Sequence, residues 1–238
     1  ENVYKERTGR AFALTHNNGT SAILAGLHAL DVQPFDEVIV PSATWWSSVM
    51  PVLHCGGVPV FAEIEPDCLG LDPEDVEKKI TDKTSAIVAT HVYGNPCEID
   101  EIDRIAKKHK LKVIYDAAHC FGTKYKGVSV LNFGDVSTIS FHATKLFHTT
   151  EGGAVVTKNP EILKRLAYLR NFGHNGPDKF EGVGINGKNS EFHAAMGLAN
   201  LKYANHILEK SESNSEIIFA FEYPLSYFFR AFFPIFTN

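Results

Sequence analysis

Strand-like and helix-like segments alternate along most of this 238-residue chain, and the alternation predicts an α/β fold. Residues 37–41 and 85–90 are nearly continuous apolar runs, as expected for strands buried on both faces of a sheet. Residues 99–109 place apolar side chains at helical spacing, with Ile102, Ile105 and Ala106 on one face. Helices of this length between strands indicate a mostly parallel sheet sandwiched by helices.

The remaining elements follow in a regular order along the chain. Runs rich in β-branched and aromatic residues predict further strands at 58–62, 111–115, 136–141 and 152–156, and a short apolar run occupies 11–14. Helical spacing or a helix-compatible composition predicts helices over 20–30, 46–55, 73–80, 160–171 and 190–210. Asp72 followed by Pro73 supports the third of these helices, as an N-cap and a first-turn proline. A glycine-rich loop is expected over 173–188.

Composition and charge exclude several classes of function. The formal net charge is −5 and the charges are interspersed, so the chain lacks the basic surface that nucleic acid requires. Neither a signal peptide nor a membrane-spanning run is expected. The four cysteines lack C-x-x-C spacing, which predicts reduced thiols and no metal site. Together these features predict a cytoplasmic location. The chain does not begin with Met, which suggests that it starts inside a longer protein.

Lys145 and Asp116 are the strongest catalytic candidates. Lys145 lies between two buried strand-like runs, and Asp116 follows another such run, at the edge of a parallel sheet where ligands bind. A lysine amine that holds an aldehyde as a Schiff base, with a carboxylate that keeps a pyridine nitrogen protonated, is the pair that pyridoxal 5'-phosphate (PLP) chemistry requires. The alternatives are a solvated surface lysine and an aspartate that caps a helix.

An ordered set of motifs occurs between residues 18 and 195. The motifs are residues 18–22 (NGTSA), 40–45 (VPSATW), 91–94 (HVYG), 116–119 (DAAH), 140–145 (SFHATK), 151–153 (EGG) and 184–195 (GINGKNSEFHAA). Over residues 10 to 210 this order resembles the DegT/DnrJ/EryC1/StrS family of PLP-dependent sugar aminotransferases. The resemblance implies the large domain of the type I, aspartate-aminotransferase-like PLP fold.

The resemblance also implies a role for each matched position. Lys145 would hold the cofactor and move a proton, and Asp116 would pair with the pyridine nitrogen. The cofactor phosphate would be bound by four residues, Gly19, Thr20 and Ser21 at a helix N-terminus and Ser140.

Three more positions match the family, two of them with alternatives left open. Trp45 would stack on the cofactor ring, or else be a core tryptophan. His119, where many relatives have glutamine, would lie near the ring, or else be a satisfied, partly buried histidine. Asn186 would reach the phosphate of the neighbouring subunit, which implies a homodimer with shared active sites. His91 and Tyr93, at the end of a strand, are weaker candidates for contact with the cofactor or sugar.

The sequence departs from the family pattern in two places. Asn17 and Asn18 precede Gly19 where relatives often have serines, a change expected to leave the phosphate site intact. Residues 211–238 do not resemble the small C-terminal domain of the family and are rich in phenylalanine and tyrosine. We therefore expect a PLP-binding large domain over residues 1–210 and an atypical tail over 211–238. The tail is a packing arm, the start of a small domain or the product of a disrupted gene.

The resemblance predicts transfer of an amino group from glutamate to a nucleotide-linked keto-deoxysugar. Residues 142–145 and 189–193 are most similar to members that act on a dTDP-4-keto-6-deoxyhexose. One alternative is a PLP-dependent sugar dehydratase, but those relatives replace the lysine by histidine, so Lys145 speaks against it. The other alternative is a non-catalytic or degenerate protein of the same fold.

Overall fold

The computed structural model describes residues 1–2, 5–6, 9 and 12–210. The chain divides into two compact units, Glu1–Leu201 and Lys202–Asn238. The sequence analysis set the boundary after residue 210, and the predicted tail at 211–238 lies outside the described residues. The first unit contains all the elements that concern the candidate site.

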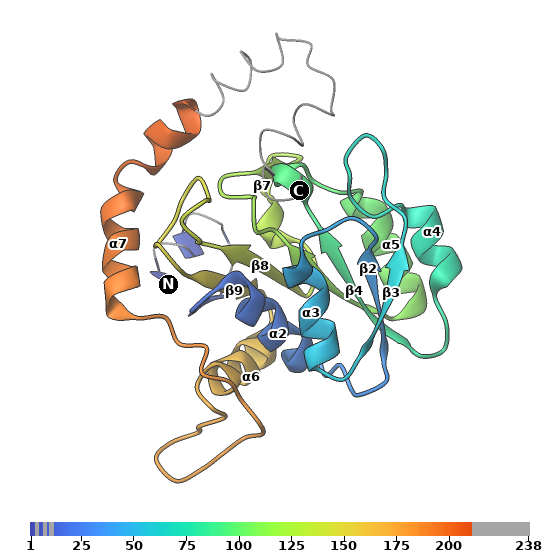
Figure 1. Ribbon diagram of the computed structural model, residues 1–238, viewed down its shortest axis with the longest axis horizontal. Coiled ribbons are helices and arrows are strands. Elements are labelled where there is room, and N and C mark those ends of the chain that lie inside the picture. The colour runs from blue at the N-terminus through green and yellow to red at the C-terminus, as the bar shows by residue number, and fades with distance from the viewer. Residues whose placement is uncertain (3–4, 7–8, 10–11, 211–238) are drawn as a thin grey trace, which may run out of the picture. The chain divides into compact units, whose positions relative to one another are not determined.

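A seven-stranded sheet forms the centre of the first unit, in the order β1-β9-β8-β5-β4-β2-β3 (Figure 1). Its strands are β1 (Phe12–His16), β2 (Glu37–Pro41), β3 (Val58–Ala62), β4 (Thr84–Thr90), β5 (Lys112–Asp116), β8 (Val136–Ser140) and β9 (Gly153–Thr157). All neighbours pair in parallel except β9, which is antiparallel to both β8 and β1. The predicted α/β fold with a mostly parallel sheet is therefore confirmed.

Helices cover both faces of this sheet. Helices α2 (Gly19–Ala29), α3 (Trp46–His54) and α6 (Pro160–Arg170) share one apolar core with strand residues such as Val38, Val88 and Ile114. Helices α4 (Pro73–Lys79) and α5 (Ile99–His109) pack together and contact β3 and β5, respectively. Alternate strand residues point to opposite faces, so the apolar runs of β2, β4 and β5 supply both cores.

Two regions differ from the sequence prediction. The helix predicted over 190–210 is interrupted, because α7 (Glu191–Leu201) ends before a turn at residues 202–203. Its last turns contain Gly197 and Asn200, both poor helix formers. A short hairpin, β6 (Lys124–Tyr125) and β7 (Val128–Ser129), was not predicted, since strands of two residues show no alternation. None of the helices in the described part of the chain is long and apolar enough to cross a membrane.

Candidate active site

Asp116 is the last residue of β5, and its carboxylate is held at both oxygens. Its Oδ2 accepts a hydrogen bond of 2.6 Å from Ser48 Oγ, and its Oδ1 accepts one of 3.1 Å from the backbone N–H of Ala118. The side chain is buried, with 4% of its surface exposed. Residues that follow it form turns, so the alternative of a helix N-cap is wrong, although the contact with Ala118 is a local turn of the same chemistry. The carboxylate is thus ordered before any ligand reaches it.

Ser48 belongs to a small group of hydroxyls, two buried and one half-buried, that was not predicted from the sequence. It lies in the first turn of α3 and is fully buried. Its Oγ is 2.9 Å from Thr44 Oγ1 and 3.4 Å from Thr90 Oγ1, at the end of β4. Ser48 could have been found from its place on the inward face of α3, which it shares with Val49 and Val52. A polar group on an apolar face needs a buried hydrogen-bond partner.

Lys145 and His119 lie close enough to Asp116 for their charges to interact. Burial lowers the pKa of Lys145, while the nearby Asp116 carboxylate opposes that shift. Burial also lowers the pKa of His119, and the positive charge of Lys145 lowers it further. The imidazole of His119 stacks on the ring of Tyr93, with centroids 5.9 Å apart. Three predicted site residues, from the end of β5, the turn after it and the β8–β9 loop, are therefore brought together.

The N-terminus of α2 provides a second polar region. Asn18 is its N-cap, and its side-chain oxygen accepts a hydrogen bond of 2.8 Å from the N–H of Ser21. Ser21 Oγ donates in turn to Asn17 Oδ1 at 2.5 Å. The N–H groups of Gly19 and Thr20 have no acceptor among the described residues. Free amides at the positive end of a helix dipole favour an anion. Asn17 and Asn18 therefore hold the first turn of α2 in place through their side-chain hydrogen bonds to Ser21.

Two strands approach the start of α2 so closely that they leave little room for side chains. A Cβ atom on Gly153, the first residue of β9, would lie 2.7 Å from the carbonyl of Asn18. A Cβ atom on Gly19 would lie 3.1 Å from Cβ of Ser140, the last residue of β8. The loop with Lys145 joins β8 to β9, so both of its ends are anchored beside α2. The predicted phosphate residues and the loop of the predicted lysine consequently belong to one site.

Trp45 and Asn186 lie at the surface. Trp45 is the N-cap residue of α3 and is 65% exposed, so the alternative of a core tryptophan is wrong. Asn186 is exposed, its backbone oxygen accepts from Asn17 Nδ2 at 3.1 Å, and its Oδ1 accepts from Lys188 Nζ at 2.9 Å. Asn186 therefore lies next to the α2 N-terminus of its own chain.

His91 belongs to the core beneath the site. It is fully buried, stacks on Tyr115 with centroids 4.9 Å apart, and accepts a hydrogen bond from the N–H of Cys97 at Nδ1. Burial lowers its pKa to about 4, so it is neutral at pH 7. Its contact with Tyr115 supports the residue that precedes Asp116. The interpretation that His91 touches a ligand is thus wrong.

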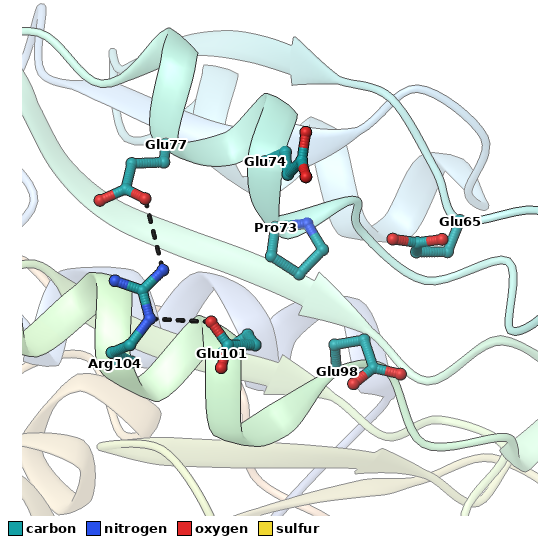
Figure 2. Close-up of a pocket in the computed structure, with 7 residues that line it drawn as sticks. All are labelled: Glu65, Pro73, Glu74, Glu77, Glu98, Glu101 and Arg104. Carbon is teal, nitrogen blue, oxygen red and sulfur yellow. Dashed lines mark hydrogen bonds and ion pairs between the residues drawn. The ribbon is translucent and has the colours of Figure 1, made fainter.

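A hollow of about 320 Å³ at α4 and α5 lies apart from these residues (Figure 2). It is lined by Glu65, Pro73, Glu74, Glu77, Glu98, Glu101 and Arg104. Arg104 already pairs with Glu77 at 3.3 Å and with Glu101 at 2.8 Å. The remaining carboxylates would repel a phosphate group, so this hollow does not suit the anion expected at the α2 N-terminus.

The chain belongs to the DegT/DnrJ/EryC1/StrS aminotransferase family, whose profile matches residues 1–220. It is 40% identical over 214 residues to the dTDP-4-amino-4,6-dideoxy-D-glucose transaminase of Shigella dysenteriae, a match that covers 90% of this chain and 58% of that protein. It is 36% identical to the GDP-perosamine synthase of Escherichia coli O157:H7, covering 91% and 60%. NtdA of Bacillus subtilis with bound cofactor PMP superposes with a TM-score of 0.82 at 33% identity, covering 86% and 47%.

The chain therefore spans about three fifths of the length of the curated relatives it matches. Family membership and the solved neighbours indicate pyridoxal phosphate as the cofactor, which confirms the sequence prediction of this group. The residues present fit it. The free amides of α2 suit a phosphate, the half-buried amine of Lys145 suits an aldehyde, and the ordered Asp116 carboxylate suits a protonated ring nitrogen.

Proposed function

We propose that this protein is a PLP-dependent aminotransferase that moves an amino group from glutamate to a nucleotide-linked keto-deoxysugar. The observation that supports the proposal most is the meeting of Lys145, Asp116 and His119 beside the free N-terminus of α2. When bound, the cofactor supplies a conjugated ring that accepts electrons from the reacting carbon. The chain's own residues must hold that ring and move protons beside it.

Each residue has a role that follows from its surroundings. Gly19 and Thr20 would bind the phosphate through their backbone N–H groups, and Ser21 and Ser140 would bind it through hydroxyls, Ser21 by exchanging its contact with Asn17 Oδ1 for the phosphate. Asp116 would accept a hydrogen bond from the protonated ring nitrogen, because its carboxylate is buried and already oriented. Lys145 would hold the cofactor at its aldehyde carbon and, once an incoming amine has released it, would move the proton at the reacting carbon. Its lowered pKa leaves more neutral amine at pH 7 than an ordinary lysine has.

His119 and Trp45 complete the proposed site. The lowered pKa of His119 favours the neutral imidazole, which would lie near the cofactor ring without adding charge. Trp45 has an exposed ring at the N-terminus of α3, the helix that contains Ser48. It provides a flat surface for the cofactor ring.

We assign the substrate to dTDP-linked 4-keto-6-deoxyhexoses. The support is that the chain is 40% identical to a dTDP-aminosugar transaminase over 214 residues and 36% identical to a GDP-perosamine synthase over 219 residues. A direct test is the glutamate-dependent amination of matched dTDP- and GDP-linked 4-keto-6-deoxyhexoses. Faster amination of the GDP sugar would reverse the assignment.

The covalent step is tested by borohydride reduction of the PLP-bound protein, followed by peptide mapping. We expect the pyridoxyl label on Lys145, no label in Lys145→Ala, and a normal label in Lys158→Ala, whose lysine is exposed beyond β9. A label on another lysine would refute the assignment. A labelled protein that does not react with glutamate would instead support the non-catalytic alternative.

We further propose a homodimer in which Asn186 serves the partner's phosphate site. Its exposure beside the α2 N-terminus supports this, because a two-fold axis nearby would place the same loops opposite each other. Hybrids of Lys145→Ala and Asn186→Ala chains provide a sharp test. If Asn186 acts across the interface, the hybrid has one intact site and binds PLP tightly at half occupancy. If Asn186 acts within its own chain, or the protein is a stable monomer, no tight site is recovered.

A further inference from the structure

The hydroxyl of Ser48 makes the shortest hydrogen bond to the Asp116 carboxylate. We propose that Ser48 is a positioning residue that holds the carboxylate of Asp116 in the direction of the cofactor's ring nitrogen. The inference rests on the proposed function, because it concerns the group that Asp116 would meet. Ser48 acts through Asp116, and the structure places no other side-chain donor from the described residues on that carboxylate.

The bond between Ser48 and Asp116 is short and shielded from water. The 2.6 Å distance between Ser48 Oγ and Asp116 Oδ2 lies in the range for a hydroxyl bonded to a carboxylate anion. Ser48 is fully buried and Asp116 is 4% exposed, so water does not compete for the bond. Loss of a bond of this kind leaves a buried acceptor without its partner.

The surrounding hydroxyls determine which way the proton points. An ionised carboxylate only accepts, so the single hydroxyl proton of Ser48 must point to Asp116. The lone pairs of Ser48 Oγ then accept from Thr44 Oγ1 at 2.9 Å or from Thr90 Oγ1 at 3.4 Å. The Thr44 and Thr90 hydroxyls also lie 3.2 Å apart, so both can support Ser48 while its proton stays on the carboxylate. Ser48 is therefore the side-chain donor that holds the Asp116 carboxylate in one orientation.

Ser48 also links three elements that are distant in sequence. It belongs to α3, whereas Thr90 ends β4 and Asp116 ends β5. Without the Ser48 hydroxyl, only the Ala118 N–H would hold the carboxylate, at one oxygen, and the side chain could turn about its terminal bond. The consequence would be a weaker contact at the ring nitrogen, with the phosphate and lysine contacts retained.

The test compares the affinity of PLP with that of its analogue in which carbon replaces the ring nitrogen. The ratio of the two dissociation constants isolates the nitrogen contact, because both ligands offer the same phosphate and aldehyde. We expect Ser48→Ala to reduce the preference for PLP by about tenfold, from the usual strength of a hydrogen bond to a charged group. Ser48→Cys keeps a side chain of similar shape but donates weakly. It should give the same reduction, and it replaces the alanine variant in the test if that variant folds poorly.

Ser137→Ala is the matched control. Ser137 is equally buried, but its hydroxyl donates to the Phe133 carbonyl at 2.9 Å, so its loss should leave the ratio unchanged. Equal weakening of both ligands in the Ser48 variants, or an unchanged ratio, would overturn the inference. A wild-type protein that is not labelled at Lys145 would refute the proposed function instead, so the two failures are distinguishable.

Discussion

The two polar regions of the site are built in different ways. At the N-terminus of α2, five consecutive residues, 17–21, form the cap, its hydroxyl contact and the free amides. At Asp116, the contributing residues come from α3, β5, the turn after β5 and the β8–β9 loop. The first region depends on local geometry that one helix start supplies. The second depends on the alignment of several elements, so a change far away in sequence can alter it.

This comparison predicts that the two regions fail separately. Changes at the α2 N-terminus should alter phosphate affinity and local stability, whereas changes around Asp116 should alter the chemistry of the ring. A change at the α2 N-terminus that altered the chemistry of the ring, or a change around Asp116 that altered phosphate affinity, would contradict this prediction.

The largest expected effect is that of Asp116→Asn. The change is nearly isosteric and removes the charge that stabilises a protonated ring nitrogen. We expect the amino-transfer half-reaction with glutamate to slow by about a hundredfold or more, since about 1.4 kcal/mol of barrier corresponds to tenfold in rate. Rapid-mixing absorbance measures the rate, and circular dichroism checks that helix content is retained. An unchanged rate would leave Asp116 only its turn contact with Ala118.

The next effect is a loss of stability in acid, to which two buried histidines, His16 and His91, contribute. His16, at the end of β1, has its pKa lowered to about 3 by burial and by the charge of Arg170, and burial lowers the pKa of His91 to about 4. Both are neutral in the fold and become protonated on unfolding below about pH 6.5. Stability should therefore be complete above pH 6.5 and fall as the pH drops toward 4, by at most about 1.4 kcal/mol per pH unit for each histidine.

Urea unfolding between pH 4.5 and 7.5 measures this dependence. We expect His16→Phe to remove the share of the slope due to His16, because phenylalanine takes up no proton. His54→Phe is the control, since His54 is exposed on the surface of α3 and should not change the slope. A slope that His16→Phe leaves intact would show that the depressed pKa is not coupled to folding.

Gly153→Ala tests the close approach of β9 to α2. The added methyl group would meet the Asn18 carbonyl, a backbone group that cannot rotate away. We expect a loss of about 1–3 kcal/mol in the free energy of unfolding, with weaker phosphate affinity. Gly26→Ala within α2 is the control, because its methyl would make ordinary contacts with Val136 and Ile114 and favour the helix. Equal effects of the two changes would contradict the steric argument.

The smallest effect is expected for Asn18→Ala, which removes the α2 cap. The cost should be about 1 kcal/mol in urea unfolding. Asn159 caps α6 through the N–H groups of Glu161 and Ile162, so Asn159→Ala should cost about the same. Only the Asn18 change should also weaken binding of inorganic phosphate. Similar phosphate affinities in the two variants would place the anion elsewhere.

Much of the architecture could be predicted because its signals are local. Strands such as β2 and β4 are short apolar runs, and α5 has a clear apolar face, so burial and periodicity identify them without tertiary information. The hairpin of β6 and β7 escaped prediction because its turn places Lys126 and Gly127 at positive φ, and lysine is not a typical residue there. The end of α7 was missed because apolar spacing continues beyond it.

By itself, the sequence determined the α/β class, the order of the elements and the lysine and aspartate to examine, since each depends on neighbouring residues or on an ordered set of motifs. Only the tertiary structure decided that Ser48 bonds Asp116, that His91 is buried beneath the site and that Gly153 touches the start of α2. These contacts join residues that are dozens of positions apart. Their existence depends on how helices and strands pack, because the partner of a buried polar group is chosen by proximity in space and leaves no periodic signal along the chain.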